Sequence, residues 1–169
     1  PGDDAVIAGG VTVTADVSTV TLNSLTNNGT LVFSGWSSTL TATNVTINGT
    51  VTHGINTASS GPWTPDNRVY IACSNLTVEG TGKIDADGKG YQGISSGDGY
   101  GPGGGQQYCG GGYGGKGGLP SGGASGGGAT YGTTSAPEDP GSAGGSYSSH
   151  QGNHGGGAVR IDASGQVSV

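Results

Sequence analysis

The residues Leu25-Thr-Asn-Asn-Gly-Thr-Leu31 recur as Val45-Thr-Ile-Asn-Gly-Thr-Val51, twenty positions further along the chain. In both copies aliphatic residues alternate with polar ones on either side of an Asn-Gly turn, which is typical of short β-strands joined by a tight turn. Leu76-Thr-Val-Glu-Gly-Thr-Gly82 is interpreted as a third copy, delayed by an insertion from about Asn56 to Asn67. A fixed period of this length predicts a repeat architecture.

A fourth copy follows a long glycine-rich stretch. Val69-Tyr-Ile-Ala-Cys-Ser74 matches Val159-Arg-Ile-Asp-Ala-Ser164, and Leu76-Thr-Val78 matches Val167-Ser-Val169 after an offset of one residue. The first two segments lie 90 positions apart, so removing the 70 residues from 88 to 157 restores the twenty-residue period. The strands before and after the stretch therefore belong to successive repeats.

These repeats predict an all-β fold, a parallel β-helix or β-solenoid with rungs of about twenty residues. A rung is one turn of the chain, stacked on the turn before it. Inward aliphatic side chains then form the core, outward Thr and Ser form polar ladders, and backbone hydrogen bonds join the rungs. Only 30% of the residues are hydrophobic and 9% are charged, which suits layers that each bury a few aliphatics. An antiparallel sandwich is the alternative, and the constant register argues against it.

We predict three segments: solenoid rungs in residues 1–87 with a Trp/Pro loop at 55–68, a glycine-rich insertion at 88–157 packed on the solenoid, and a returning strand at 158–169. Most of the chain's 40 glycines lie in the insertion. From Gly111 to Leu119 the pattern Gly-Gly-X repeats every three residues, which is the period of polyproline II helices. A collagen helix is not expected, because proline is too sparse. Extended segments without side chains can approach closely and hydrogen-bond laterally, and the insertion's tyrosines add apolar area. We therefore expect an ordered block and not a flexible loop.

Several pieces of this region carry a family resemblance. They are Lys83–Tyr91, Gly101–Gly105, Gly110–Lys116, Tyr131–Pro137, Gly141–Gly145 and Gly155–Ile161. The pattern resembles the glycine-rich rungs of bacterial extracellular proteins with a right-handed parallel β-helix, and the triplet stretch resembles the polyglycine-II layers of some phage receptor-binding adhesins. The resemblance covers about half of the chain. It implies an architecture, since such segments occur in adhesins, surface filaments and polysaccharide-active enzymes alike.

Two sets of residues are candidates for stabilising bonds. Cys73 and Cys109 are the only cysteines, and an even count in an exported chain predicts a disulfide; two free thiols are the alternative. Asp85 and Asp87 share one face of a strand, and with Asp98 they form a candidate calcium site. The alternative is a set of solvated turn aspartates, because Lys89 occupies an acidic position of the loop pattern. No other cofactor is expected.

No catalytic constellation stands out among the remaining polar residues. Arg68 and Arg160 are the only arginines and lie near strand starts, and His53, His150 and His154 are interpreted as loop histidines. Four Asn-x-Ser/Thr sequons begin at Asn28, Asn44, Asn48 and Asn75. Trp63 and Tyr113 are the candidate contact aromatics, because an exposed ring can stack on a sugar or a neighbouring subunit; a Trp63 folded onto the protein is the alternative.

The net charge, the lack of long apolar runs and the repeat exclude several classes of function. A net charge of −6 with five Lys and Arg predicts neither nucleic acid binding nor attraction to acidic lipid, and no apolar run predicts membrane insertion. Because the chain starts at Pro1 and the repeat stops part-way through a rung at Val169, we expect a processed fragment or a rung completed by another subunit. The leading prediction is an extracellular or cell-surface structural protein, not an enzyme, that self-associates head-to-tail into a filament or layer. A glycan-binding adhesin or phage-type receptor-binding tip is the alternative, and a fragment of a polysaccharide lyase or hydrolase is the third.

Overall fold

The computed structural model describes residues 2–120, 126–133 and 135–169. These residues form ten β-strands and no helix, so the described part of the chain is all-β, as predicted. The chain divides into two compact units. The two-sheet unit comprises Pro1–Gly54, Asn67–Asp85 and Val159–Val169, and the glycine-rich unit comprises Ile55–Asp66 and Ala86–Ala158.

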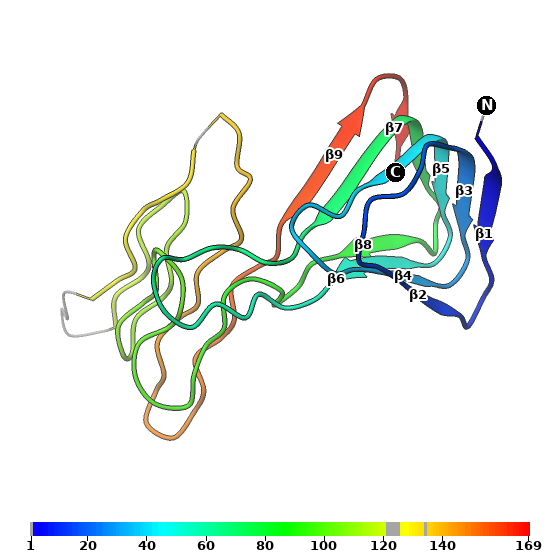
Figure 1. Ribbon diagram of the computed structural model, residues 1–169. Coiled ribbons are helices and arrows are strands. Elements are labelled where there is room, and N and C mark those ends of the chain that lie inside the picture. The colour runs from blue at the N-terminus through cyan, green and yellow to red at the C-terminus, as the bar shows by residue number, and fades with distance from the viewer. Residues whose placement is uncertain (1, 121–125, 134) are drawn as a thin grey trace. The chain divides into compact units, whose positions relative to one another are not determined.

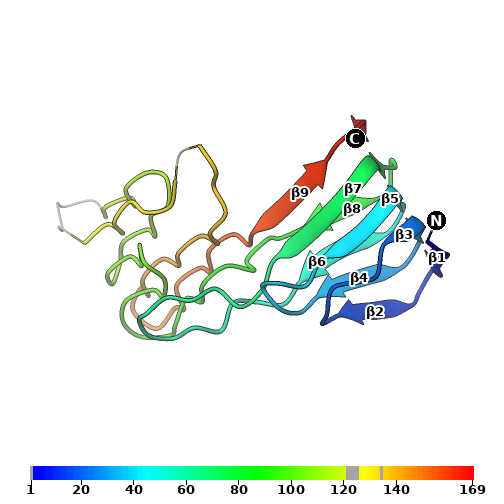
Figure 2. The same ribbon diagram turned by 45° about the horizontal axis from the view of Figure 1, so that its top comes forward.

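All strands lie in the two-sheet unit and form two parallel sheets (Figures 1 and 2). The first sheet contains β1 (Asp4–Ile7), β3 (Leu22–Asn27), β5 (Leu40–Ile47), β7 (Val69–Val78), β9 (Val159–Ala163) and β10 (Val167–Ser168). The second sheet contains β2 (Thr12–Ala15), β4 (Thr30–Phe33), β6 (Thr50–His53) and β8 (Lys83–Asp85). Successive strands along the chain alternate between the sheets up to β8. Two sheets built in this alternating order are consistent with a β-solenoid-like fold.

The strand register confirms the repeat alignment across the sheets. Leu25 pairs with Val45 at the predicted spacing of twenty residues, and Val69 pairs with Val159 across the glycine-rich stretch. The one-residue offset is also present, because Val167 pairs with Leu76. Every pairing between the named strands is parallel, which excludes an antiparallel sandwich for the described part of the chain.

The third repeat differs from its predicted alignment at the turn. Thr50 pairs with Lys83, so the glycine equivalent to Gly49 is Gly82 and not Gly80. A Cβ at Gly49 would overlap the carbonyl oxygen of Gly29, and a Cβ at Gly82 would overlap that of Ile47, whereas nothing lies near Gly80. Glycine recurs at this corner because the backbone of the preceding rung passes against it, and the third turn holds two extra residues.

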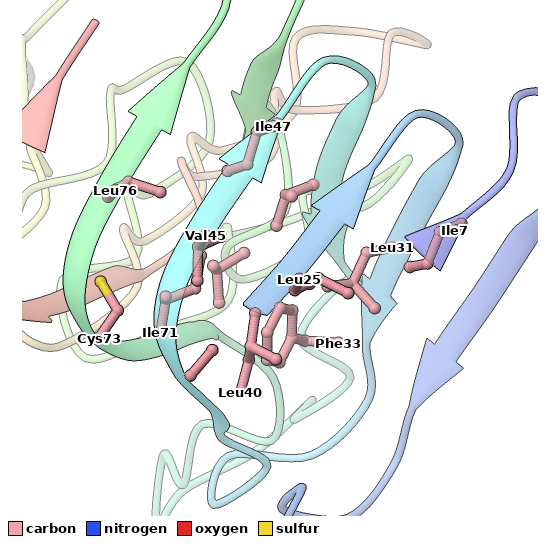
Figure 3. Packing of buried hydrophobic residues seen from close by; sticks show 13 residues of the cluster. Ile7, Leu25, Leu31, Phe33, Leu40, Val45, Ile47, Ile71, Cys73 and Leu76 are labelled. Atoms are coloured by element: carbon pink, nitrogen blue, oxygen red, sulfur yellow. The ribbon is translucent and has the colours of Figure 1, made fainter. Parts of the chain in front are cut away.

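The core of the two-sheet unit lies between the sheets (Figure 3). Phe33 and Ile47 are completely buried, and Val45, Val51 and Ile71 are at most 2% exposed. Alternating burial along β4, β5 and β6 matches the period of two that places one strand face inward. Each fully buried aliphatic of this kind contributes about 1.5–3 kcal/mol of transfer free energy.

Polar side chains run along the outside of the sheets, as the sequence predicts, and asparagine side chains there form hydrogen bonds between rungs. Asn48 Nδ2 donates to Asn28 Oδ1 over 2.8 Å, and Asn75 Nδ2 donates to Asn44 Oδ1 over 2.9 Å. Each of these four asparagines begins a sequon. The hydrogen bonds between rungs give them a structural role that does not depend on glycosylation. Asn27 is fully buried instead: its Nδ2 donates to the Thr50 carbonyl, and its Oδ1 accepts from the Gly29 N–H.

The glycine-rich unit is ordered by backbone hydrogen bonds between segments that are neither helix nor strand. Gly117 N donates to Gly128 O over 2.9 Å, and Gly128 N donates to Gly110 O over 3.0 Å. The segments lie so close that a Cβ at Gly93 would overlap the backbone of Gly152. Close backbone contact thus replaces side-chain packing, which agrees with the expected ordered block.

The Trp/Pro loop is placed differently from the prediction. Residues 55–66 cluster with the glycine-rich unit and not with the rungs. The Tyr91 hydroxyl donates to the Trp63 carbonyl over 3.1 Å, and Asn56 N and Nδ2 both donate to the Lys89 carbonyl. Both insertions therefore build one unit. In the described residues, no helix is long and apolar enough to cross a membrane.

Candidate functional site: an exposed aromatic patch

The described chain has two non-glycine residues with positive φ, and both lie in the same part of the glycine-rich unit. Tyr108 has φ of 72° and Ser148 has φ of 53°. A bulky residue in this region is an outlier, because its Cβ crowds the backbone; the cost is about 1–2 kcal/mol for each residue. Such strain persists where the surroundings impose it, and it is enriched at functional sites.

The two strained residues frame one set of aromatic rings, which we call the aromatic patch: Tyr108, Tyr147 and His150. The rings of Tyr108 and Tyr147 meet edge to face with centroids 5.4 Å apart, and His150 stacks on Tyr147 at 6.3 Å with 10° between the ring planes. Tyr108 is 49% exposed and Tyr147 is 63% exposed. The patch therefore presents ring surface to solvent while its members hold one another in place.

Backbone hydrogen bonds fix the base of the patch. Tyr147 N donates to His150 O and His150 N donates to Tyr147 O, which closes a two-residue turn through Ser148 and Ser149. Positive φ at the first of two turn residues is the feature of a type II′ turn, where glycine is preferred. The Tyr108 N–H donates to the Ser146 carbonyl over 2.9 Å, which places the two ring-bearing segments side by side.

Buried Ser146 anchors the second segment. Its Oγ accepts from Gly97 N over 2.8 Å and donates to Gly97 O over 3.1 Å. Asp98 follows directly, and its carboxylate accepts from the Gln107 N–H over 3.0 Å. Nearby, Gln151 Nε2 donates to the Gly93 carbonyl. Exposed Asp98 thus contacts the residue before Tyr108, and exposed Gln151 directly follows His150; we call these two side chains the rim groups.

The predicted calcium site does not come together as a cluster. Asp85 pairs with Lys83 at 2.9 Å, and Asp98 is engaged by Gln107. Asp85 belongs to the two-sheet unit, whereas Asp87 and Asp98 belong to the glycine-rich unit. Within the described ranges there is no group of three or more His, Cys, Asp or Glu side chains that could hold a metal ion.

The predicted disulfide is wrong, because Cys73 and Cys109 are both free thiols. Cys73 is part of the aliphatic core of the two-sheet unit, and burial raises the pKa of its thiol. Cys109 is buried in the glycine-rich unit, where its N–H donates to the Gln106 carbonyl and its own carbonyl accepts from Gly145 N. Each cysteine therefore acts as a small buried side chain in a different unit.

The predicted contact aromatics are both packed within the glycine-rich unit. Trp63 lies 5.8 Å from the Tyr91 ring and 6.0 Å from the Tyr100 ring, which is the alternative of a Trp folded onto the protein. Tyr113 meets Tyr131 at 4.9 Å, and its hydroxyl is buried. Burial raises the pKa of Tyr91 and of Tyr131 to about 12. These five aromatics serve mainly as the unit's side-chain core.

Sequence reasoning did not single out the aromatic patch. It counted Tyr108 and Tyr147 among rings that supply buried area and interpreted His150 as a plain loop residue. One signal was present: Gln106–Cys109 and Ser146–Gln151 are short stretches without glycine inside a glycine-rich region. Comparisons with protein families, with curated proteins and with solved structures found no match to this chain.

Proposed function

We propose that this chain is an extracellular or cell-surface glycan-binding protein, in which the aromatic patch of the glycine-rich unit contacts sugar rings. The proposal rests on one observation: among the residues that the structure describes, both non-glycine residues with positive φ frame this patch. A glycine at either position would relieve this strain, and glycine is the commonest residue of this region in a chain with 40 glycines. A functional requirement for the Tyr108 ring and for a rigid Ser148 turn explains why the strain is kept.

The chemistry of the patch suits a carbohydrate. One face of a pyranose ring presents mainly C–H groups, and an aromatic ring gives this face a flat apolar partner. Tyrosine provides such area at low conformational cost, because it has only two side-chain torsions. The rim groups Asp98 and Gln151 then offer partners for sugar hydroxyls. Under this proposal the two-sheet unit is a closed right-handed parallel β-helix that serves as a rigid support.

A glycan array probed with the whole chain tests the proposal, followed by calorimetry with each saccharide bound. In Tyr108→Asn the ring is lost, while asparagine tolerates the left-handed backbone. We expect at least a tenfold loss of affinity with an unchanged or raised melting temperature. Leu119→Ala is the control, since Leu119 is 52% exposed in the same unit but lies outside the patch. Absence of any saturable glycan binding, or equal losses in both variants, contradicts the proposal.

A second candidate function is self-association through the first rung of the two-sheet unit. β1 and β2 are the edge strands at the same end of the two sheets (Figure 2). The inward side chains there line an apolar depression of about 280 Å³, which includes Ile7, Val13 and Leu31. A second copy that pairs its own end strands with β1 and β2 would cover this surface, and such heterologous contacts build open assemblies.

Light scattering over a hundredfold range of concentration, with electron microscopy of the same samples, tests this second candidate. Val13 is 39% exposed, and Val13→Asp places a charge in the depression, so we expect it to shift assemblies to monomers. Val20→Asp is the control, because Val20 is 79% exposed and does not line the depression. Monomers of the unmodified chain at every concentration contradict self-association. The enzyme alternative, a polysaccharide lyase or hydrolase fragment, remains an untested prediction.

A further inference from the structure

The outer face of the first sheet holds both arginines of the chain in one column of stacked side chains. The Arg68 guanidinium lies over the Trp36 ring at 4.6 Å and over the Tyr70 ring at 4.8 Å. The Arg160 guanidinium lies over the Tyr70 ring at 4.8 Å as well. The parallel register produces this column, because Tyr70 on β7 pairs directly with Arg160 on β9.

The two arginines differ in how their charge is balanced. Arg160 NH2 lies 3.0 Å from the Asp162 carboxylate, which also accepts a 2.8 Å hydrogen bond from the Tyr70 hydroxyl. These hydrogen bonds from Arg160 and Tyr70 lower the pKa of Asp162, so it stays ionised at neutral pH. Arg68 has no carboxylate partner in the described part of the chain, and its buried Nε–H has no acceptor. The cluster therefore carries one uncompensated positive charge on a chain of net charge −6.

A shallow depression continues this face along the strands. It has a volume of about 280 Å³, and its lining includes Thr21, Thr41, Thr43, Ala72, Ser74 and Asp162. Tyr70 and Ala72 point to the same side of β7, because side chains two apart share a strand face. The depression reaches the arginine column at Asp162, the partner of Arg160, and hydroxyl-bearing side chains line much of the rest.

We infer that this face binds an acidic saccharide chain, with a carboxylate of the sugar held by Arg68 and the neighbouring sugar in the hydroxyl-lined depression. A guanidinium whose face lies over aromatic rings still has N–H groups along its edge, and these can make a bidentate contact to a carboxylate. Threonine and serine hydroxyls donate to and accept from sugar hydroxyls. From Arg68 to Ser74 the strand spans about 20 Å, which suits a short oligosaccharide aligned with β7. This site belongs to the two-sheet unit and is independent of the aromatic patch.

Calorimetry of the whole chain with a uronic-acid tetrasaccharide tests the inference, with a sulfated and a neutral tetrasaccharide of equal length beside it. We expect saturable binding of the uronate that weakens as salt is raised and depends on Arg68, and no Arg68-dependent binding of the neutral sugar. Arg68→Gln should lower the affinity at least tenfold. Lys116→Gln is the matched control, since it removes one positive charge at an exposed position of the other unit and should leave the affinity unchanged.

A second variant is needed in case Arg68→Gln lowers the stability of the protein as well as its affinity for uronate. Thr43→Glu adds a negative charge at an exposed position of the depression and leaves the stacked column intact, so it should also lower uronate affinity several-fold. Equal binding of uronate and sulfated sugars assigns the site to anionic saccharides generally and overturns its selectivity for carboxylate. Displacement of the sugar by equimolar inorganic phosphate, equal losses in Arg68→Gln and Lys116→Gln, or no uronate binding each overturns the saccharide site itself.

Discussion

The two units of this protein reach a compact state by opposite means. In the two-sheet unit, aliphatic side chains such as Ile47 and Phe33 fill the space between parallel sheets. In the glycine-rich unit, segments pack backbone against backbone, and a side chain at Gly93 or Gly128 would overlap the neighbouring chain. The two-sheet unit is stabilised by burial of apolar side chains, whereas the glycine-rich unit is stabilised by backbone hydrogen bonds and close contacts that an added Cβ would prevent. We therefore expect the glycine-rich unit to be destabilised mainly by added side-chain carbon, and the two-sheet unit mainly by carbon removed from its core.

The largest effect should follow from adding one methyl group to the glycine-rich unit. In Gly128→Ala the new Cβ overlaps the Gly103 carbonyl and approaches Gly112 N to 2.5 Å. We expect a loss of about 3 kcal/mol or more, because backbone on both sides must move. Hydrogen exchange followed by mass spectrometry should show lost protection within residues 86–158.

Gly114→Ala provides the control, because nothing lies within 4 Å of the added methyl. It should change stability by less than about 0.5 kcal/mol. Similar losses of protection in both variants would mean that the backbone contacts do not order this unit.

The next largest effect should follow from removing side-chain carbon from the two-sheet unit. Ile47→Ala leaves a cavity at a fully buried position, and the expected cost is about 2–5 kcal/mol. Trp36 lies in the two-sheet unit and Trp63 in the glycine-rich unit. In a Trp63→Phe background, tryptophan fluorescence during urea unfolding therefore reports on the two-sheet unit alone. Val20→Ala, at a position that is 79% exposed, should leave the midpoint unchanged. An equal shift from both changes would contradict a side-chain core.

Alkaline pH should destabilise the glycine-rich unit through its two buried tyrosines. Burial raises the pKa of Tyr91 and Tyr131 from the ordinary value near 10 to about 12. Between these values the unfolded tyrosines release protons that the folded ones retain, so stability is full below pH 10 and falls as pH rises toward 12. Fluorescence of Trp63 in a Trp36→Phe background, with absorbance of tyrosinate, measures both changes. Loss of Tyr131 ionisation in Tyr131→Phe should make the decline shallower, and an unchanged slope would contradict the assignment.

The smallest effect should come from the asparagine ladder on the outside of the sheets. The hydrogen bond from Asn48 to Asn28 is exposed, so each single alanine substitution should cost about 0.5–1 kcal/mol. A double-mutant cycle of Asn28→Ala and Asn48→Ala isolates the pair, and we expect a coupling of about 0.5 kcal/mol. Additive effects would show that the ladder does not contribute to rung stacking.

The repeat was predictable because rung stacking imposes a constant register on the chain. The parallel pairing of Leu25 with Val45, and of Val69 with Val159 across the insertion, follows directly from the twenty-residue period. The third turn was aligned two residues too early, because Glu79-Gly80-Thr81 imitates the Asn-Gly-Thr turn while the close backbone approach occurs at Gly82. A local motif therefore predicted a turn but not which glycine packs against the preceding rung.

The candidate sites were less predictable, because they depend on side chains brought together from distant segments. Cysteine count alone suggested a disulfide, whereas the fold buries Cys73 and Cys109 separately in different units. Trp63 was a predicted contact residue but packs against Tyr91, whereas the rings of Tyr108 and Tyr147 are exposed. Arg68 and Tyr70 are close in sequence, yet Arg160 joins them only through the pairing of β7 with β9.

By itself the sequence determined the all-β class, the twenty-residue period, the return of the chain at Val159 and the ordered glycine-rich region, because each is encoded by local alternation and spacing. Tertiary structure alone decided which glycines touch a neighbouring backbone, how the Trp/Pro loop joins the glycine-rich unit, and where the aromatic patch and the stacked arginines form. These features depend on which segments become neighbours in space. Neighbours of that kind are set by the summed packing of the whole unit, which no single stretch of sequence contains.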